Sequence, residues 1–275
     1  MSDQNPKSQN LTAPSSRTGR PKARLFIEDP LAADAALTLT GNQGNYLVNV
    51  MRVQSGDTLL LFNGREGEWQ ARVTQTRRQA CMVRIVRQLR PQRAEPGPWL
   101  LFAPIKKTAV DFVVEKATEL GVSRLWPVFT LHTAASRVNL ERLRAHAIEA
   151  SEQCERLTVP AVESPLPLSE IAARWPPDRT LLVLDERGRG APIADILVAD
   201  NRAGRGWERP PGILAGPEGG LAASELDALA RLPFVARVTL GPRILKAETA
   251  ALAALACWQA TAGDWTEPPL PRDGR

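Results

Sequence analysis

The stretch GILAGPEGGLAASELDALARL, residues 212–232, decides the fold of the second half of this chain. It begins with a short apolar run, breaks at Gly-Pro-Glu-Gly-Gly in residues 216–220, and resumes with apolar residues at helical spacing. This pattern predicts a strand, a glycine-rich turn and an amphipathic helix. Glycines at such a turn let backbone N–H groups come close to a ligand, because no Cβ stands in the way. The turn is therefore a candidate binding loop.

The spacing of the glycines indicates which ligand the turn does not suit. A phosphate-binding P-loop has the pattern Gly-x-x-x-x-Gly-Lys-Ser/Thr, and a dinucleotide fold has Gly-x-Gly-x-x-Gly. Residues 216–220 instead read Gly-x-x-Gly-Gly, with the carboxylate of Glu218 inside the turn. A neutral or cationic ligand suits such a loop better than a phosphate, so the pattern disfavours a nucleoside triphosphate or dinucleotide enzyme.

Strands and helices alternate on both sides of this turn. Apolar runs predict strands at 99–105, 122–130, 180–186 and 236–241, and helical spacing predicts helices at 106–121, 140–153 and 246–261. Gly121 is placed to end the first of these helices, and Asn139 to cap the second. Such alternation is typical of a parallel α/β sheet covered by helices on both faces.

Ligands of open α/β sheets bind at the carboxyl ends of the strands. Three loop segments follow predicted strands, and the same rule gathers them at one edge of the sheet: LDERG at 184–188, GPEGG at 216–220 and LGPRILKAETA at 240–250. We expect these three segments to form one pocket.

The first third of the chain has a different pattern. Between Leu25 and Leu89, short apolar runs are divided by turn residues such as Gly56-Asp57 and Asn63-Gly64, which predicts strands and hairpins in a small β-barrel or half-barrel. The segment PQRAEPGP, residues 91–98, has the composition of a linker. The predicted division of the chain is a disordered lead-in at 1–22, a barrel at 23–92, an α/β domain at 97–265 and a tail at 266–275.

Positive charge is unevenly distributed. The formal net charge is +5, yet the segment from Arg72 to Arg93 holds seven arginines and no acidic residue, and the lead-in is also basic. Clustering of this kind steers polyanions, so nucleic acid is a candidate partner. The alternative, equally open at this point, is that the arginines lie on the outward face of a strand and keep a sheet edge soluble.

The remaining composition is that of an ordinary globular protein, with 43% hydrophobic and 24% charged residues. No apolar stretch approaches the roughly 20 residues that span a bilayer, and the polar N-terminus lacks the apolar segment of a secretory signal, so we expect a cytoplasmic protein with no membrane partner. Cys81, Cys154 and Cys257 lie far apart with no Cys-x-x-Cys, which favours reduced thiols over disulfides and predicts no metal site.

Taken in order, the motifs resemble those of a known family. GPEGG is followed about twenty residues later by LGPRILKAETAALAAL, and upstream stand RLFIED, NYLVNVMRVQSGD, LFNGREGEW, KATELGV and EQCER. The set is similar to the SPOUT class of S-adenosylmethionine-dependent RNA methyltransferases, and within it to the family that methylates N3 of a uridine in 16S rRNA. The resemblance covers nearly the whole chain. It implies a PUA-like N-terminal barrel, a parallel C-terminal sheet with a trefoil knot, and a homodimer that acts on the assembled small (30S) ribosomal subunit.

Two positions depart from the family pattern. The family's arginine before the final helix is Lys246 here, which keeps the positive charge and loses the planar fork of a guanidinium. Ala222 stands where a serine or threonine often caps the helix after the glycine turn, while Glu225 still occupies the second position of a capping box.

The resemblance also implies site residues. Binding of S-adenosylmethionine falls to the three pocket segments, at Leu184, Gly216, Pro217, Glu218, Gly219, Gly220, Leu240, Gly241, Ile244 and Leu245. The alternative for Leu240, Ile244 and Leu245 is that they belong to the core. The catalytic candidates are Lys246, Arg156 and Glu248, the last of which could instead cap the final helix. The predicted RNA contacts are Arg24, Arg52, Arg84 and Arg87.

Other polar residues have no single predicted role. Glu218 and Arg243 are further candidates for handling the proton and charge of the uridine. Glu152, Gln153 and Arg156, in the motif EQCER, could brace the knot or contact RNA, and His132 is predicted in a loop outside the motifs. The function that the sequence predicts is methylation of a 16S rRNA uridine at N3 from S-adenosylmethionine. The alternatives are a SPOUT methyltransferase of another RNA site and a non-catalytic RNA-binding adaptor.

Overall fold

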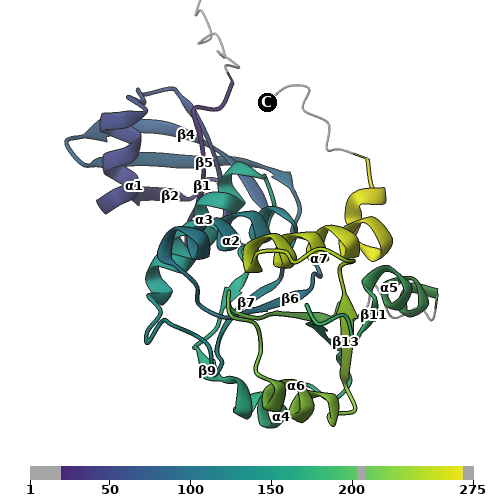
Figure 1. The fold of residues 1–275 in the computed structure, drawn as a ribbon. Helices are drawn as coiled ribbons and strands as arrows, with labels where there is room; N and C mark the ends of the chain where they lie inside the picture. The colour runs from purple at the N-terminus through teal and green to yellow at the C-terminus, as the bar shows by residue number, and fades with distance from the viewer. Residues whose placement is uncertain (1–19, 203–208, 269–275) are drawn as a thin grey trace, which may run out of the picture.

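A computed structural model describes residues 20–202 and 209–268. Figure 1 shows two bodies, an N-terminal one built on strands and a larger one in which helices lie on both sides of a sheet. The predicted lead-in and tail lie largely outside the described residues. Within the described part of the chain, no helix is long and apolar enough to cross a membrane.

The N-terminal body, called the barrel domain below, is a curled five-stranded sheet in the order β1-β3-β4-β5-β2. Its pairs are antiparallel except for the parallel pair of β1 and β3. β1 and β2 are the two edge strands of this sheet and do not pair with each other. Of the two predicted forms, the domain is therefore the half-barrel. Its elements are β1 (Ala23–Phe26), β2 (Ala36–Leu39), α1 (Gly41–Asn45), η1 (Tyr46–Val50), β3 (Thr58–Phe62), β4 (Glu68–Arg77) and β5 (Ala80–Arg90).

One prediction for this domain is wrong. The run GNQGNYLVNV, residues 41–50, lies in the part of the chain for which strands and hairpins are predicted, but it is helical, as α1 followed by the π-helix η1. Leu47 is fully buried, and Val48 and Met51 pack against the same apolar cluster. This i, i+1, i+4 spacing is one face of a helix, whereas a strand would have turned alternate residues to opposite sides. The β-branched residues of the run concealed that pattern.

The larger body contains an all-parallel sheet in the order β11-β13-β10-β12-β6-β7-β8, with β9 paired to β7. Its strands are β6 (Trp99–Phe102), β7 (Arg124–Phe129), β8 (Ala161–Val162), β9 (Leu166–Pro167), β10 (Leu181–Leu184), β11 (Ala191–Pro192), β12 (Gly212–Ala215) and β13 (Val235–Thr239). Its helices are α2 (Lys107–Glu119), α3 (Leu140–Gln153), η2 (Leu168–Glu170), α4 (Ile171–Arg174), α5 (Ile193–Arg202), α6 (Ala223–Ala230), α7 (Ala247–Ala262) and η3 (Asp264–Thr266). The predicted parallel α/β sheet is confirmed, and the trefoil knot stays a prediction.

Helices cover both faces of this sheet. In Figure 1, α2, α3 and α7 lie on one face and α4 and α6 on the other. Two separate apolar clusters reflect this, because Leu100 and Phe102 of β6 belong to one cluster and the intervening Leu101 to the other. The central strands β6, β7, β10 and β12 are buried on both faces, which is why they read as continuous apolar runs in the sequence.

The predicted helix ends are confirmed. Asn139 accepts a hydrogen bond from the backbone N–H of Arg142 at 3.0 Å, as an N-cap residue does. Gly121 follows α2 with a φ of +80°, a left-handed conformation that favours glycine. These caps fix where the chain leaves each helix and returns to the sheet.

Candidate active site

A pocket opens at the carboxyl ends of three adjacent strands, β10, β12 and β13, beside the first turn of α7. Its volume is about 470 Å³, within the range of small-molecule sites. The three predicted segments meet there, and all ten residues predicted to bind the cofactor line it, together with Asp185, Glu186, Arg243 and Lys246. The sheet order explains this convergence, since β10 lies between β12 and β13. The expected single pocket is therefore present.

The glycine turn that forms one wall is a closed β-turn. The N–H of Gly220 donates to the carbonyl of Pro217 at 2.9 Å, and Gly220 has a φ of +69°. A Cβ on Gly220 would lie 2.2 Å from the Glu186 carboxylate, so the loops after β10 and β12 are in close contact. Glu218 is exposed. The carboxylates of Glu186 and Glu218 make this side of the pocket acidic, which suits a cationic ligand.

Glu225 connects this wall to the neighbouring loop. Its carboxylate accepts from the N–H of Ala222 at 2.9 Å and from the N–H of Leu131 at 2.8 Å. Alanine has no side-chain acceptor, so only the glutamate half of the capping box is made. The second bond fastens the loop after β7 to the start of α6.

His132 lies in that same loop and contacts the glycine turn, a role that the sequence reasoning missed. Its Nδ1 is 3.0 Å from the carbonyl oxygen of Gly220, and its Cβ lies against Gly219. Ligands bind at the carboxyl ends of parallel strands, and β7 is parallel to β10, β12 and β13. Applying this rule to β7 as well would have placed its following loop at the same edge of the sheet.

Asp185 is the second residue that sequence reasoning passed over. Its side chain is fully buried and pairs with the guanidinium of Arg237, whose Nε lies 3.0 Å from Oδ2. It also accepts from the N–H of Arg187 at 3.0 Å. The pair joins the end of β10 to β13, and the N–H of Gly188 donates to the Asp185 carbonyl at 3.3 Å, which closes a turn after Leu184. Glu186 lies in this turn, with its carboxylate beside Gly220.

The third wall runs from Leu240 to Lys246. Leu240 packs against the main apolar cluster, so it serves both the core and the pocket. Ile244 is 87% exposed, which excludes the core as its place in this structure. Lys246 is the N-cap residue of α7 and is exposed at the pocket. Of the three catalytic candidates Lys246, Arg156 and Glu248, Lys246 is the one that lines the pocket, where Glu218 and Arg243 also lie.

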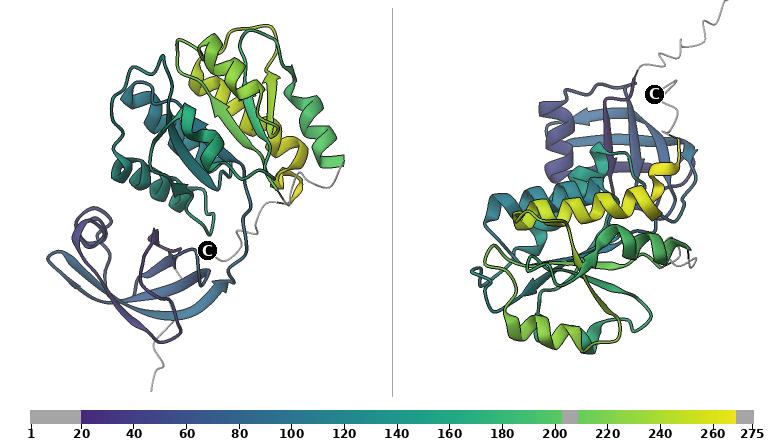
Figure 2. Two further views of the ribbon diagram at one scale, coloured as in Figure 1. Left: turned by 90° about the horizontal axis from the view of Figure 1, so that it is seen from below. Right: turned by 45° about the vertical axis from the view of Figure 1, so that its right-hand side comes forward.

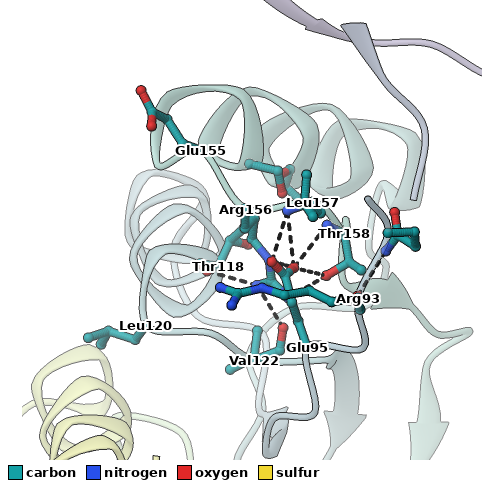
Figure 3. A network of polar contacts seen from close by, with 12 residues as sticks. Arg93, Glu95, Thr118, Leu120, Val122, Glu155, Arg156, Leu157 and Thr158 are labelled. Atoms are coloured by element: carbon teal, nitrogen blue, oxygen red, sulfur yellow. Dashed lines mark hydrogen bonds and ion pairs between the residues drawn. The ribbon is translucent and has the colours of Figure 1, made fainter. Parts of the chain in front are cut away.

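The other two catalytic candidates lie outside the pocket lining. Glu248 is half-buried in the first turn of α7. Arg156 lies at the boundary with the barrel domain, where Nη1 donates to the carbonyls of Thr118 and Val122, each at 2.9 Å (Figure 3). Its guanidinium is engaged by the protein, so a structural role fits these contacts better than catalysis.

The predicted RNA contacts divide into two groups. Arg52, Arg84 and Arg87 are exposed on the barrel domain. Arg24 is not available to RNA, because its side chain is only 8% exposed and its nitrogens donate to Glu68, Ser151 and Arg156. The prediction for Arg24 is therefore corrected. Among residues 20–202 and 209–268, no cluster of three or more His, Cys, Asp or Glu side chains could hold a metal ion.

Comparison with known families agrees with this architecture. A family model described as an RNA methyltransferase domain matches residues 95–259, and one described as an RNA methyltransferase PUA domain matches residues 39–86. The first match covers more than half of the chain. The protein belongs to the RNA methyltransferase family, with a PUA domain at its N-terminal side.

Its relatives define the family more narrowly. The ribosomal RNA small subunit methyltransferase E of Rickettsia conorii is 30% identical over 234 residues, which cover 85% of this chain and 93% of the relative. The protein of the same name from Bacillus subtilis is 27% identical and covers 84% of this chain and 94% of its own length. A crystal structure of ribosomal RNA small subunit methyltransferase E from Neisseria gonorrhoeae bound to S-adenosyl methionine is similar with a TM-score of 0.79, at 27% identity, over 88% of this chain and 99% of that one. The chain belongs with this group.

Proposed function

We propose that this protein transfers a methyl group from S-adenosylmethionine to N3 of a uridine in 16S rRNA. One observation carries the proposal: all the motif residues that the resemblance assigned to the cofactor line a single pocket at the carboxyl ends of β10, β12 and β13. The Neisseria relative, which carries its cofactor in the crystal, supports the same assignment.

The residues of the pocket fit this cofactor. Its methionine part carries positive charge, and the carboxylates of Glu186 and Glu218 lie on the lining. The glycine turn leaves room for close backbone approach at Gly216 and Gly219, and Leu240, Ile244 and Leu245 supply an apolar wall for an adenine ring. When bound, S-adenosylmethionine supplies an activated methyl group, so the protein has chiefly to position the acceptor.

The acceptor requires charge compensation. Uridine N3 carries a proton, and its removal leaves negative charge on the ring and its carbonyl oxygens. Lys246 and Arg243 are the cationic side chains of the lining, and Lys246 stands at the start of α7 beside Leu245. A fixed positive charge at this point stabilises the uridinate. The carboxylates of Glu186 and Glu218 are the lining groups that can accept a proton.

The proposal includes the partners and location of the protein. Exposed arginines of the barrel domain hold the rRNA, and the assembled 30S subunit is the preferred substrate. The protein acts in the cytoplasm as a homodimer. The homodimer is what the resemblance to the family implies.

The decisive experiment is to map N3-methyluridine in 16S rRNA from a strain lacking the protein, with and without complementation. We expect the modification to be lost at one uridine and restored by the wild-type gene. Purified protein should bind about one equivalent of S-adenosylmethionine per chain in calorimetry. Binding of ATP or NAD instead, or RNA binding without any methylation, would contradict the proposal, and the second result would identify an adaptor.

A further inference from the structure

The motif EQCER, residues 152–156, is not part of the pocket. It forms the end of α3 and the turn after it, and the barrel domain is attached there. Arg24 of β1 donates to the carbonyls of Ser151 and Arg156, each at 2.7 Å, and Arg90 of β5 donates to the carbonyl of Glu155 at 2.7 Å. Two cations therefore meet the end of a helix that carries partial negative charge.

These two arginines are held in place by one buried carboxylate. The side chain of Glu68 is fully buried in the barrel domain and accepts from Arg24 Nε at 2.7 Å and from Arg90 Nη2 at 2.8 Å. Arg24 also stacks on the ring of Phe62, with its Cζ 3.8 Å from the ring centroid. Moving either guanidinium away removes a hydrogen bond and a charge partner from the buried Glu68, so the barrel presents α3 with a rigid pair of donors.

The chain between the two domains is fastened as well. Glu95, in the predicted linker, accepts from the N–H of Leu157 at 3.0 Å and from the N–H and hydroxyl of Thr158 at 3.0 and 2.6 Å (Figure 3). Arg156 lies beside it, with Nε 3.7 Å from the Glu95 carboxylate. The proline-rich composition of residues 91–98 predicts a linker. The contacts show that this segment, called the strap below, is hydrogen-bonded to the larger body at Glu95, near its middle.

We propose that these contacts make the EQCER turn a rigid junction, and that Glu95 and Arg156 are positioning residues that hold the RNA-binding face of the barrel in register with the methyl-transfer pocket. The inference rests on the proposed function. Domains joined by a linker ordinarily move relative to each other. Here a buried Arg–Glu–Arg group and the bonded segment around Glu95 act at one point. Figure 2 shows the connecting chain that leads from the barrel domain to the larger body. A small rotation at the junction would displace a bound uridine from the pocket.

The test separates positioning from binding. In Glu95→Ala, the affinities for S-adenosylmethionine and for 30S subunits should stay within about twofold of wild type, because neither surface is touched. The single-turnover methylation rate should fall by about 10²-fold, the loss that a misplacement of about 1 Å produces. Arg156→Lys keeps the positive charge near Glu95, but an ammonium group cannot replace the planar guanidinium that donates to the Thr118 and Val122 carbonyls. Its methylation rate should lie between those of wild type and Glu95→Ala.

Glu267→Ala is the matched control. It removes a carboxylate from the exposed Arg93–Glu267 ion pair beside the same strap, at 3.6 Å, and should keep the wild-type rate. A wild-type rate for Glu95→Ala would overturn the inference. Equal losses of both affinities would also overturn it, because they would report general unfolding.

A distance measurement keeps the inference testable if the proposed function fails. Fluorophores on unnatural amino acids at exposed Gln79 of the barrel domain and Asp227 of α6 report the separation of the two bodies. We expect a narrow distance distribution in wild type and a broader one in Glu95→Ala, whatever RNA is methylated. An unchanged distribution would overturn the rigid junction, whereas wild-type protein that methylates no rRNA would overturn the proposed function alone.

Discussion

The pocket and the junction are built in opposite ways. The pocket consists of three short loops, each contained in one sequence motif, and its shape depends on backbone conformations such as the left-handed Gly220. The junction consists of charged side chains from distant parts of the chain, such as Arg24, Glu68 and Arg156, and its strength depends on their burial. A site of the first kind can be recognised from local sequence. A site of the second kind exists only after folding, and the following experiments separate the two.

The largest effect is expected at the junction. Glu68→Gln leaves two largely buried arginines without their common carboxylate, and breaking such a group costs about 3–5 kcal/mol of unfolding free energy. Urea denaturation should show a much lower midpoint, with cofactor affinity kept under native conditions. Glu170→Gln, which removes an exposed partner of Arg174, should change the midpoint little. If Glu68→Gln and Glu170→Gln had equal urea midpoints, the buried ion pairs of the junction would stabilise the protein no more than an exposed surface pair does.

At the pocket, the largest effect is expected in rate rather than stability. Lys246→Ala should lower the single-turnover rate on 30S subunits by about 10²-fold or more, as the loss of one preorganised electrostatic contact does. Cofactor affinity and the oligomeric mass in solution should be unchanged, and Lys246→Arg should stay active. Lys116→Ala, which removes a positive charge from α2, is the control. A wild-type rate for Lys246→Ala would reduce Lys246 to a solvated charge and return attention to Glu248 and to Arg243 of the pocket lining.

A third prediction concerns the backbone of the glycine turn. Gly220→Val places a β-branched residue at a φ of +69°, which costs about 1–2 kcal/mol, so cofactor affinity should fall about tenfold in calorimetry. Gly56→Val puts the same strain at a φ of +93° in an open turn of the barrel domain and should leave cofactor affinity unchanged. If both variants bound the cofactor equally well, the turn would not shape the pocket.

A smaller effect is expected on the barrel surface. Reversing the charge at Arg84 and Arg87 should weaken RNA binding and flatten its dependence on salt, since each lost phosphate contact lowers the slope by about one. Both side chains are exposed, and Arg84 pairs only loosely with Asp34 at 3.9 Å. Filter binding at several salt concentrations measures this. If these variants lost affinity for the cofactor but kept their affinity for RNA, the barrel domain would not be the RNA-binding part of the protein.

The smallest effect is a difference in acid sensitivity. Burial by itself raises the pKa of Glu68, but hydrogen bonds from Arg90 and Arg24 and their charges outweigh it and leave the pKa below its ordinary 4.5. A lowered folded pKa contributes stability above pH 4.5, and this contribution is lost as the pH falls through the lowered value. Burial raises the pKa of Glu152 nearby, so that carboxyl acts in the opposite direction. Below pH 4.5, the free energy of unfolding should fall more steeply with pH in wild type than in Glu68→Gln, as measured by urea denaturation at several pH values. If the two variants showed the same dependence on pH, the lowered pKa of Glu68 would be contradicted.

The sequence by itself determined the parallel α/β sheet, the boundaries of its main helices and the loops of the pocket. It could do so because short apolar runs, Asn139, Gly121 and the glycine turn act over a few residues, where local patterns and backbone conformation decide the structure. Lys246 was found in the same way, since it lies within one of the motifs.

Only the tertiary structure decided the rest. The run at 41–50 became helical because Leu47, Val48 and Met51 found a common apolar surface on the barrel. His132 reached the glycine turn through the ordering of four parallel strands. Arg24 left its predicted RNA-binding role, and Arg156 is engaged by the protein away from the pocket, because each found partners far away in the chain. The desolvation of a guanidinium depends on neighbours that no local pattern specifies.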